Sequence, residues 1–220
     1  MGKTKIVLVD DHNIVREGIR NSFQKEDNFI VIGEADTGRA AIELVSLSTP
    51  DIVIMDISMP DLNGIDATKR ILSINSSIKV IALSMYSDKA YVMGMLNAGV
   101  SGYLIKSCSF KELLLAINTV LSGEMYLCTK VIPIVVENSL RSSWNQNKKN
   151  SDSKLSRRER EVLQLLSEGQ NTNNIAEKLI ISPKTVSAHI ANIKNKLNIH
   201  STASLTKFAI SQGITTVDFT

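Results

Sequence analysis

The stretch "KIVLVDDHN", residues 5–13, gives the first indication of the fold in the first half of the chain. A short apolar run, typical of a strand buried on both faces, leads directly into two adjacent carboxylates, Asp10 and Asp11. Like charges side by side repel, and burial of either one is costly. A metal ion, a basic partner or exposure to water could offset that cost, and the rest of the sequence has to discriminate between these alternatives.

Similar apolar runs recur through the first 125 residues, at 6–9, 29–32, 52–55, 80–83 and 103–105. Apolar residues at helical spacing fill the intervals, from Ile14 to Phe23 in the first of them and from Leu113 to Leu121 in the last. Because strands alternate with helices five times, the pattern predicts an α/β fold with a doubly wound, five-stranded parallel sheet over residues 1–125.

The sequence changes character after residue 125. Residues 126–153 are interpreted as a linker with one short helix at 132–140, broken near Pro133, and a polar stretch in which Trp144 is expected to lie against one of the domains. Residues 154–220 lose all strand signals and predict a small all-α domain. Ser156 and Glu159 form a capping box, and Ser182 precedes Pro183 as the cap of a later helix, which together favour a helix-turn-helix.

Charge and composition narrow the class of protein. Residues 1–130 carry 13 Lys/Arg against 15 Asp/Glu, whereas residues 131–220 carry 12 against 7, so the basic second part suggests a nucleic-acid partner. No run of 18 apolar residues exists, and the N-terminus lacks the pattern of a signal peptide. Cys108 and Cys128 have no metal-binding spacing. These features predict a cytoplasmic protein with reduced thiols and no membrane partner.

Polar residues follow four of the predicted strands, where ligands bind in doubly wound sheets. Asp10 and Asp11, Asp56, Ser84 and Lys106 all take this place in the sequence. Three converging carboxylates would repel one another unless a hard divalent cation joined them, and Mg²⁺ prefers oxygen ligands. Lys106 and Ser84 would stabilise an anion added to one carboxylate, which indicates a phosphoryl group on Asp56.

Other polar residues in this region are expected to be solvated or locally hydrogen-bonded. Asp51, Asp61 and Asp66 are expected to be solvated turn residues, and His12 is expected to be solvated or locally hydrogen-bonded rather than a metal ligand.

The stretches "VLVDDH", "IVIMDISMPDLNG", "IALSM" and "GYLIKS" resemble the signatures of response-regulator receiver domains across the whole of the first 125 residues. The resemblance implies that Asp56 accepts a phosphoryl group from a sensor histidine kinase, while Pro60 and Gly64 shape the loop that follows it. It also implies roles for other residues: Mg²⁺ would be held by Asp10, Asp11, Asp56 and the main-chain carbonyl of Ser58, and the phosphoryl group would be sensed by Ser84, Lys106 and the aromatic switch Tyr103.

One departure from the receiver pattern is Ser107, where many receivers carry a proline after a cis peptide. A cis bond before a residue other than proline costs about 3–4 kcal/mol. The sequence alone therefore does not decide whether the Lys106–Ser107 peptide is cis or trans.

The stretch "LSRREREVLQLLSEGQNTNNIAEKLIISPKTVSAHIANIKNKLNI" resembles the LuxR-type helix-turn-helix, so the whole chain resembles a NarL/FixJ-type regulator. Small residues and lysines on the helix after Ser182 suit close entry into the major groove of DNA. The resemblance places Thr185, Ser187, Ala188 and Ala191 in the groove and Lys184, Thr172 and Asn173 on the backbone; Asn192 and Lys194 complete the predicted contacts. Relatives often carry Lys where this chain has Ser187 and Ala191, which predicts modest direct readout of bases.

The sequence as a whole favours a DNA-binding transcriptional regulator of a two-component system, not an enzyme, that uses Mg²⁺ and becomes a homodimer when Asp56 is phosphorylated. One alternative is an atypical regulator that binds double-stranded DNA without phosphorylation. The other is an acyl-phosphate phosphohydrolase of the haloacid-dehalogenase type. Those enzymes place their nucleophile in a D-x-D pattern after the first strand, whereas the pair here is adjacent.

Overall fold

The structure is a computed structural model that describes residues 2–85, 87–144 and 155–216. Internal contacts divide the chain into two compact units, Met1–Asn138 and Ser139–Thr220. Each has its own hydrophobic core. Within the described residues, no helix is both long and apolar enough to cross a membrane.

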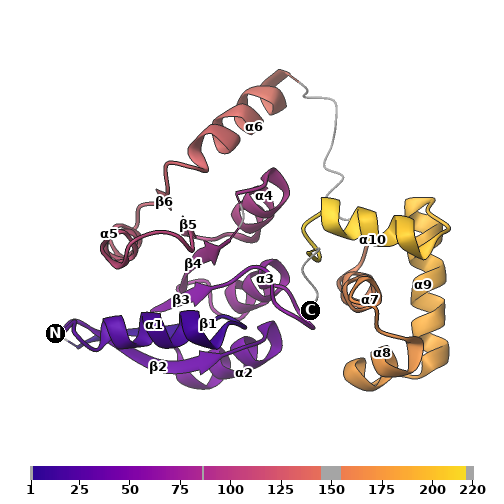
Figure 1. Cartoon of the computed structure of the whole chain (residues 1–220), viewed down its shortest axis with the longest axis horizontal. Helices are drawn as coiled ribbons and strands as arrows, with labels where there is room; N and C mark the ends of the chain where they lie inside the picture. The colour runs from indigo at the N-terminus through magenta and orange to yellow at the C-terminus, as the bar shows by residue number, and fades with distance from the viewer. Residues whose placement is uncertain (1, 86, 145–154, 217–220) are drawn as a thin grey trace. The chain divides into compact units, whose positions relative to one another are not determined.

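The first unit is built on a parallel sheet in the order β2-β1-β3-β4-β5-β6 (Figure 1). Its strands are β1 (Thr4–Val9), β2 (Phe29–Ala35), β3 (Ile52–Met55), β4 (Lys79–Ser84), β5 (Gly102–Ile105) and β6 (Tyr126–Leu127). Every residue of β3 and β5 is buried, which explains why these strands consist of uninterrupted apolar runs. The first five strands confirm the predicted sheet.

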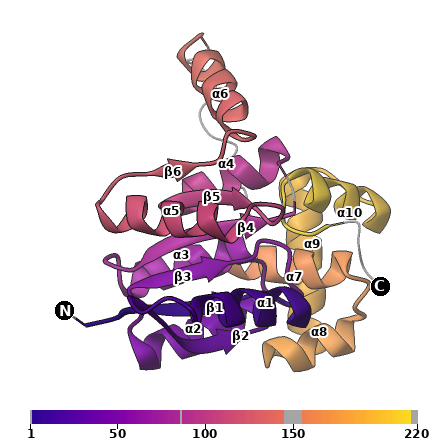
Figure 2. The same cartoon turned by 60° about the vertical axis from the view of Figure 1, so that its left-hand side comes forward.

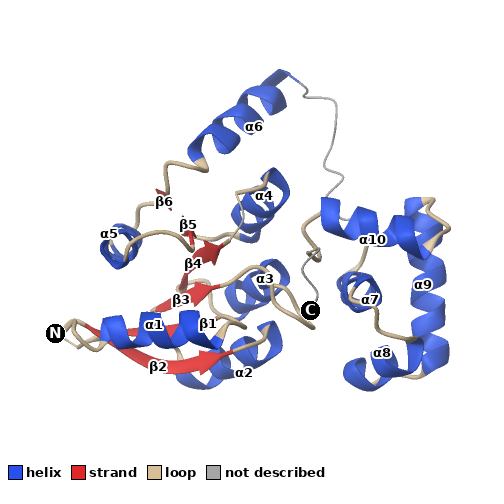
Figure 3. Ribbon diagram, viewed as in Figure 1, coloured by secondary structure: helices blue, strands red, loops and turns tan. Residues whose placement is uncertain are grey.

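Helices cover both faces of this sheet (Figure 3). They are α1 (Asn13–Phe23), α2 (Gly38–Ser48), α3 (Gly64–Ile74), α4 (Lys89–Ala98) and α5 (Phe110–Leu121). Helices α2, α3 and α4 pack against one another in a row. Helices α1 and α5 meet through an edge-on contact of Phe23 and Phe110, whose ring centroids are 5.0 Å apart. The alternation of strand and helix therefore produces the predicted doubly wound architecture.

Ile14 departs from the expected apolar stripe of α1. Its side chain is 87% exposed, whereas Phe23 is buried. The two are nine positions apart, and at 100° per residue they lie on opposite sides of the helix. The assignment of Ile14 to the apolar side was therefore wrong, because the core contact of α1 runs through Ile19 and Phe23.

The segment after α5 adds structure that the sequence did not predict. Strand β6 pairs with β5, and Cys128 and Val131 are buried in the first core. Helix α6 (Ile132–Trp144) follows without the predicted break, because a proline in the first turn of a helix removes no intrahelical hydrogen bond. The side chain of Trp144 and the predicted linker at 145–153 lie outside what the structure describes.

The second unit is a helical cluster of α7 (Arg157–Ser167), α8 (Thr172–Leu179), α9 (Pro183–Leu197) and α10 (Thr202–Ser211), shown in Figure 2. Helix α7 packs against α8, α9 and α10, and α8 packs against α9. The predicted capping box at Ser156 and the cap at Ser182 before Pro183 are both present. Three residues, 180–182, join α8 to α9, which confirms the helix-turn-helix.

Candidate functional site

The carboxyl ends of β1, β3 and β5 bring together three charged side chains. Lys106 Nζ lies 2.8 Å from Asp10 Oδ2 and 2.8 Å from Asp56 Oδ2. All three side chains are at most 5% exposed. Parallel strands that end at one edge explain this convergence, since residues 46 to 96 positions apart in the sequence become neighbours there.

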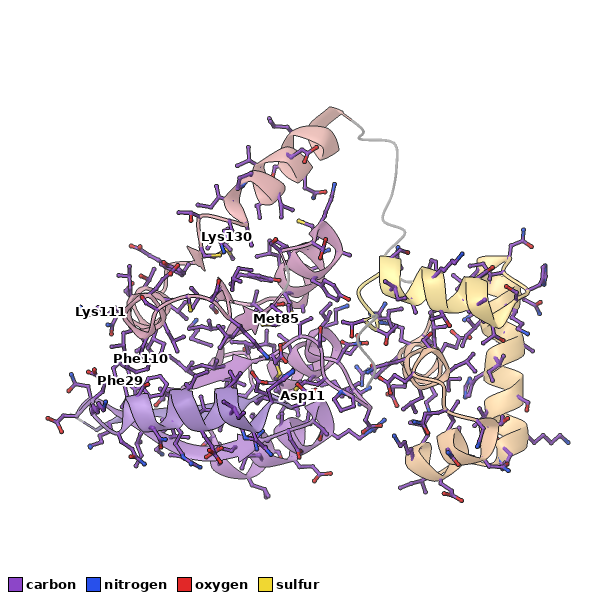
Figure 4. The ribbon with its side chains drawn as sticks, viewed as in Figure 1. Asp11, Phe29, Met85, Phe110, Lys111 and Lys130 are labelled. Atoms are coloured by element: carbon purple, nitrogen blue, oxygen red, sulfur yellow. The ribbon has the colours of Figure 1, made fainter. Side chains whose placement is uncertain are left out.

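Asp11 extends this group of carboxylates. Ligand atoms of Asp10, Asp11, His12 and Asp56 all lie within 4.8 Å of one another. Asp11 is the more accessible aspartate, with 28% of its side chain exposed, and it lies at the same edge of the sheet as Met85, which follows β4 (Figure 4). The oxygen-rich set fits a hard divalent cation. His12, as expected, is largely exposed and locally bonded, with its Nδ1 2.8 Å from Asp11 Oδ1 and 3.2 Å from Asp10 Oδ1.

The charges at this site are unbalanced. Burial raises the pKa of Asp56 to about 6; Lys106 opposes this rise and the neighbouring charge of Asp10 adds to it. Burial alone would lower the pKa of Lys106, but the charges of Asp56 and Asp10 outweigh it and raise that pKa. One lysine is thus shared between two buried carboxylates, with a third carboxylate beside them. Added positive charge would stabilise this arrangement.

Ser84 and Tyr103 lie on β4 and β5, the strands that follow β3 in the sheet. Both are fully buried, on the adjacent strands β4 and β5. A side-chain hydrogen bond joins them, and burial is the main cause that raises the pKa of Tyr103. The phenol is therefore turned inward and stays protonated. Its hydroxyl is bonded to the hydroxyl of Ser84, at the end of the neighbouring strand.

The loop between β3 and α3 has a closely defined backbone. Ile57 N donates to Asp56 Oδ1 at 2.7 Å, and Gly64 N donates to Ile57 O at 2.8 Å. A Cβ at Gly64 would lie 1.9 Å from the carbonyl oxygen of Asp56, so only glycine fits. This loop carries Pro60 and Ser58, the latter two residues after Asp56. The described residues contain no cis peptide, so Lys106–Ser107 is trans.

Two of the aspartates that were expected to be solvated are not. Asp66 is 8% exposed, and its main-chain N–H donates a hydrogen bond to Oδ1 of the cap residue Asn63. Asp61 adopts a left-handed conformation (φ 70°), and its Oδ2 forms an ion pair with Arg39 Nε of α2 at 2.7 Å. Only Asp51 is exposed, where it accepts the main-chain N–H of Lys5. The prediction failed for Asp61 and Asp66 because their partners come from the folding of the loop.

A second group of predicted residues lies on α8 and α9. Val186 and Ile193 anchor α9 in the core, so the side of this helix away from them is free. Most of the predicted contacts are exposed there and at the start of α8: Asn173, Lys184, Thr185, Ser187, Ala188, Ala191 and Asn192 are exposed, while Thr172 and Lys194 are half-buried. The structure thus brings them to the accessible surface of one helix-turn-helix.

Two hydroxyl groups on this surface have short reach. Thr185 Oγ1 lies 2.8 Å from Ser182 Oγ, and Ser187 Oγ donates to the carbonyl of Pro183 at 3.1 Å. Both hydroxyls are therefore engaged by the helix itself. Lys196, on the same helix, is bound 2.7 Å from the buried carboxylate of Glu159 and serves the fold.

The comparisons with known proteins match one family to each of the two units. The response regulator receiver domain family matches residues 6–118, and the luxR family of bacterial regulatory proteins matches residues 153–209. The chain is a response regulator of the NarL/FixJ type. As such it is a DNA-binding transcription regulator of a two-component system.

Individual relatives cover nearly the whole of this response regulator. The transcriptional regulatory protein DegU of Brevibacillus brevis is 34% identical, over 96% of this chain and 94% of its own. The response regulator UvrY of Escherichia coli K12 is 34% identical, over 95% and 94%. A solved structure of RcsB bound to DNA superposes with a TM-score of 0.60 at 27% identity, over 96% of this chain and 99% of that one.

Sequence reasoning missed the roles of several residues that support the acidic group of the first unit or the fold of the second. Arg16 donates to the main-chain carbonyl of Asp10, Arg39 holds the loop after Asp56, and Lys196 neutralises Glu159. Only for Arg16 does the sequence carry a signal, an arginine close to a predicted carboxylate. Arg16 is only six residues from Asp10, but nothing in the sequence shows that its target is a carbonyl.

Proposed function

We propose that this regulator is switched by phosphorylation of Asp56. The observation that carries the proposal is the group at the edge of the sheet, where Lys106 bridges Asp10 and Asp56 at 2.8 Å each. A sensor histidine kinase would be the donor. An oxygen of Asp56 attacks the phosphorus of a phosphohistidine, the P–N bond breaks, and the released imidazole takes up a proton.

The chemistry of Asp56 supports this role. A carboxylate whose pKa is about 6 is mostly ionised at pH 7.5, as a nucleophile must be. Burial makes its charge less well solvated than that of a surface aspartate. Lys106 is placed to pair with the added phosphoryl oxygens, since its ammonium already touches Asp56 Oδ2.

The carboxylates fit Mg²⁺, which would supply positive charge for the entering phosphoryl group. Asp10, Asp11, Asp56 and the carbonyl of Ser58 would hold it. The clustered ligand atoms and the shared lysine support this assignment. The chain's own contribution is to keep these oxygens converged in a largely buried site.

The link to the rest of the chain runs through Ser84 and Tyr103. If Ser84 turns its hydroxyl to a phosphoryl oxygen, the hydrogen bond to Tyr103 must rearrange. Burial of the phenol then depends on the phosphorylation state, which biases a two-state equilibrium. We infer that the favoured state is a homodimer that binds double-stranded DNA.

The proposed contact with DNA uses the exposed side of α9 and the start of α8. Thr185, Ser187, Ala188, Ala191 and Asn192 face the groove. Lys184, Lys194, Thr172 and Asn173 contact phosphates. The short, internally bonded hydroxyls support weak base readout, and RcsB, which binds DNA in its solved complex, supports the partner.

Intact-mass measurement tests the acceptor directly. With a small phosphodonor and Mg²⁺, the full chain should gain one phosphoryl group that is labile to base and hydroxylamine. Asp56→Asn should gain none, and the control Asp51→Asn, an exposed aspartate near the same strand, should label normally. Equal labelling of Asp56→Asn would show that another residue is the acceptor, whereas a wild type that gains no phosphoryl group would favour the atypical regulator.

Titration against two duplexes tests the DNA surface. The affinity of the protein for DNA should fall steeply with salt concentration, both for a duplex that the protein selects from a random pool and for a scrambled version of that duplex. Lys184→Ala should weaken both equally and reduce the salt slope by about 1, while Lys207→Ala, an equal loss of charge on α10, should leave both unchanged. A loss confined to the selected duplex would mean that Lys184 reads bases.

A further inference from the structure

Arg16 makes an unusual set of contacts beside the phosphorylation site. It lies on α1, and its side chain is only 15% exposed. Nη1 donates to the main-chain carbonyl of Asp10 at 2.5 Å, Nη2 donates to Asn13 Oδ1 at 2.5 Å, and Nε donates to Glu34 Oε2 at 3.0 Å. The guanidinium therefore connects the end of β1 to the start of α1 and to β2.

The contact with Asp10 is to the backbone, not to the carboxylate. The Asp10 carboxylate is engaged elsewhere, by Lys106 at Oδ2 and by the His12 main chain at Oδ1. The Asp10 main-chain N–H donates to the carbonyl of Ala35 on β2. Arg16 fixes the opposite side of the residue, namely the carbonyl that belongs to the Asp10–Asp11 peptide. The direction of the Asp11 side chain depends on the orientation of that peptide.

Arg20 provides a built-in comparison. It lies one turn further along α1, and its Nη1 donates to the other oxygen of Glu34 at 2.9 Å. Within the described residues this is the only side-chain hydrogen bond of Arg20, so it shares the partner of Arg16 without touching Asp10. Charge and the link to β2 are common to both arginines. Only Arg16 reaches the site.

We propose that Arg16 is a positioning residue for the divalent-cation site, which it serves by fixing the Asp10 carbonyl and hence the Asp11 carboxylate. The proposal rests on the proposed function, because it presumes that Asp11 binds the cation. Residues that orient metal ligands from outside the coordination sphere typically change affinity 10- to 100-fold when replaced. A guanidinium suits this task, since its planar fork can satisfy three acceptors at once.

The sign of the effect separates positioning from simple charge. A cation close to a Mg²⁺ site repels the ion, so a residue that acted only through its charge would make Mg²⁺ bind more tightly when removed. A positioning residue has the opposite effect. Lysine keeps the charge but cannot reproduce the three-way contact, so Arg16→Lys should resemble Arg16→Met.

The experiment is calorimetric titration of Mg²⁺ into the full chain, with wild type, Arg16→Met, Arg16→Lys and Arg20→Met compared. We expect the Kd for Mg²⁺ to rise about tenfold in both Arg16 variants and less than twofold in Arg20→Met. Thermal unfolding without Mg²⁺ should show a larger loss in Arg16→Met than in Arg20→Met, since both lose the pair with Glu34 but only Arg16 also holds the Asp10 carbonyl and Asn13.

An unchanged or lower Kd in Arg16→Met would overturn the positioning role. Phosphorylation by a small donor distinguishes this failure from failure of the proposed function. If wild type labels on Asp56 and Arg16→Met binds Mg²⁺ like Arg20→Met, only the role of Arg16 is wrong. If wild type neither binds Mg²⁺ nor labels, the proposed function itself is wrong.

Discussion

Two buried carboxylates, one in each unit, show opposite behaviour although their surroundings look alike. Asp56 is 2% exposed with Lys106 at 2.8 Å, and Glu159 is 3% exposed with Lys196 at 2.7 Å. Yet the pKa of Asp56 is raised to about 6, with burial as the largest cause. That of Glu159 is lowered, because hydrogen bonds from Lys196 and Ser156 outweigh the effect of burial.

The difference lies in how the positive charge is shared. Among the residues that the structure describes, Lys196 pairs with Glu159 alone, and the main-chain N–H of Ser156 adds a second donor through the capping box. Lys106 is divided between Asp56 and Asp10. The carboxylate in the helical unit is therefore satisfied by the fold. The carboxylate in the receiver, Asp56, has too little positive charge beside it. A bound cation would supply that charge, and a change of charge on Asp56 would remove the need for it.

Removal of the two lysines should give the largest contrast. Lys106→Met leaves two buried carboxylates without a cation, which should cost the receiver about 3–5 kcal/mol at pH 7.5 without Mg²⁺. Lys196→Met leaves Glu159 with its capping hydrogen bonds and should cost the helical unit about 1–2 kcal/mol. Hydrogen exchange of amides in each core measures both free energies in the full chain. Equal losses would show that the two sites are electrostatically alike.

Removal of the charge on each carboxylate should change stability in opposite directions. A raised pKa means that the ionised form of Asp56 destabilises the folded state above about pH 6, and that this cost disappears as pH falls toward 4. Asp56→Asn should therefore stabilise the metal-free receiver by about 1–2 kcal/mol at pH 7.5 and by little at pH 4. Denaturant unfolding in a chelator at both pH values measures this, and a destabilised variant at pH 7.5 would contradict it.

Glu159→Gln should instead destabilise the helical unit by about 1 kcal/mol at pH 7, since glutamine keeps the capping box but loses the ion pair. Glu159→Ala, which loses both, should cost about 1 kcal/mol more. Because the pKa of Glu159 is lowered, its contribution is present above the ordinary glutamate pKa and is lost as pH falls through the lower folded value. The pH dependence of unfolding should therefore be steeper in wild type than in Glu159→Gln below about pH 4.5.

The backbone offers a smaller contrast between the units. Asp61 (φ 70°) and Ile180 (φ 53°) both adopt the left-handed conformation, but Asp61 is held by Arg39, whereas Ile180 is a β-branched residue with a 91% exposed side chain. Ile180→Asn should stabilise the helical unit by about 0.5–1 kcal/mol, because asparagine tolerates this conformation. Asn198→Ile, at φ 55°, is the reverse control and should destabilise. No change in either melting temperature would mean that Ile180 is not strained.

The sequence predicted those features that depend on local pattern or on the edge of a parallel sheet. The sequence predicted that four residues lie together because each follows or ends a strand: Asp10, Asp56, Ser84 and Lys106. The helix caps at Ser156 and Ser182 were predicted from short sequence motifs. Features that depend on distant pairing were not predictable. Nothing local couples Lys196 to Glu159 across 37 positions, and strand β6 is two residues long and visible only through its pairing with β5.

The coupling between the two units is tested most directly by the DNA affinity of the phosphorylated full chain. A duplex selected by the protein from a random pool can be titrated before and after treatment with a small phosphodonor and Mg²⁺, with wild type and Asp56→Asn compared. We predict that phosphorylation of wild type increases affinity at least tenfold, together with dimer formation in sedimentation, and that Asp56→Asn does not respond. Stoichiometric phosphorylation of wild type without any change in affinity, or an equal response of Asp56→Asn, would contradict a switch at Asp56.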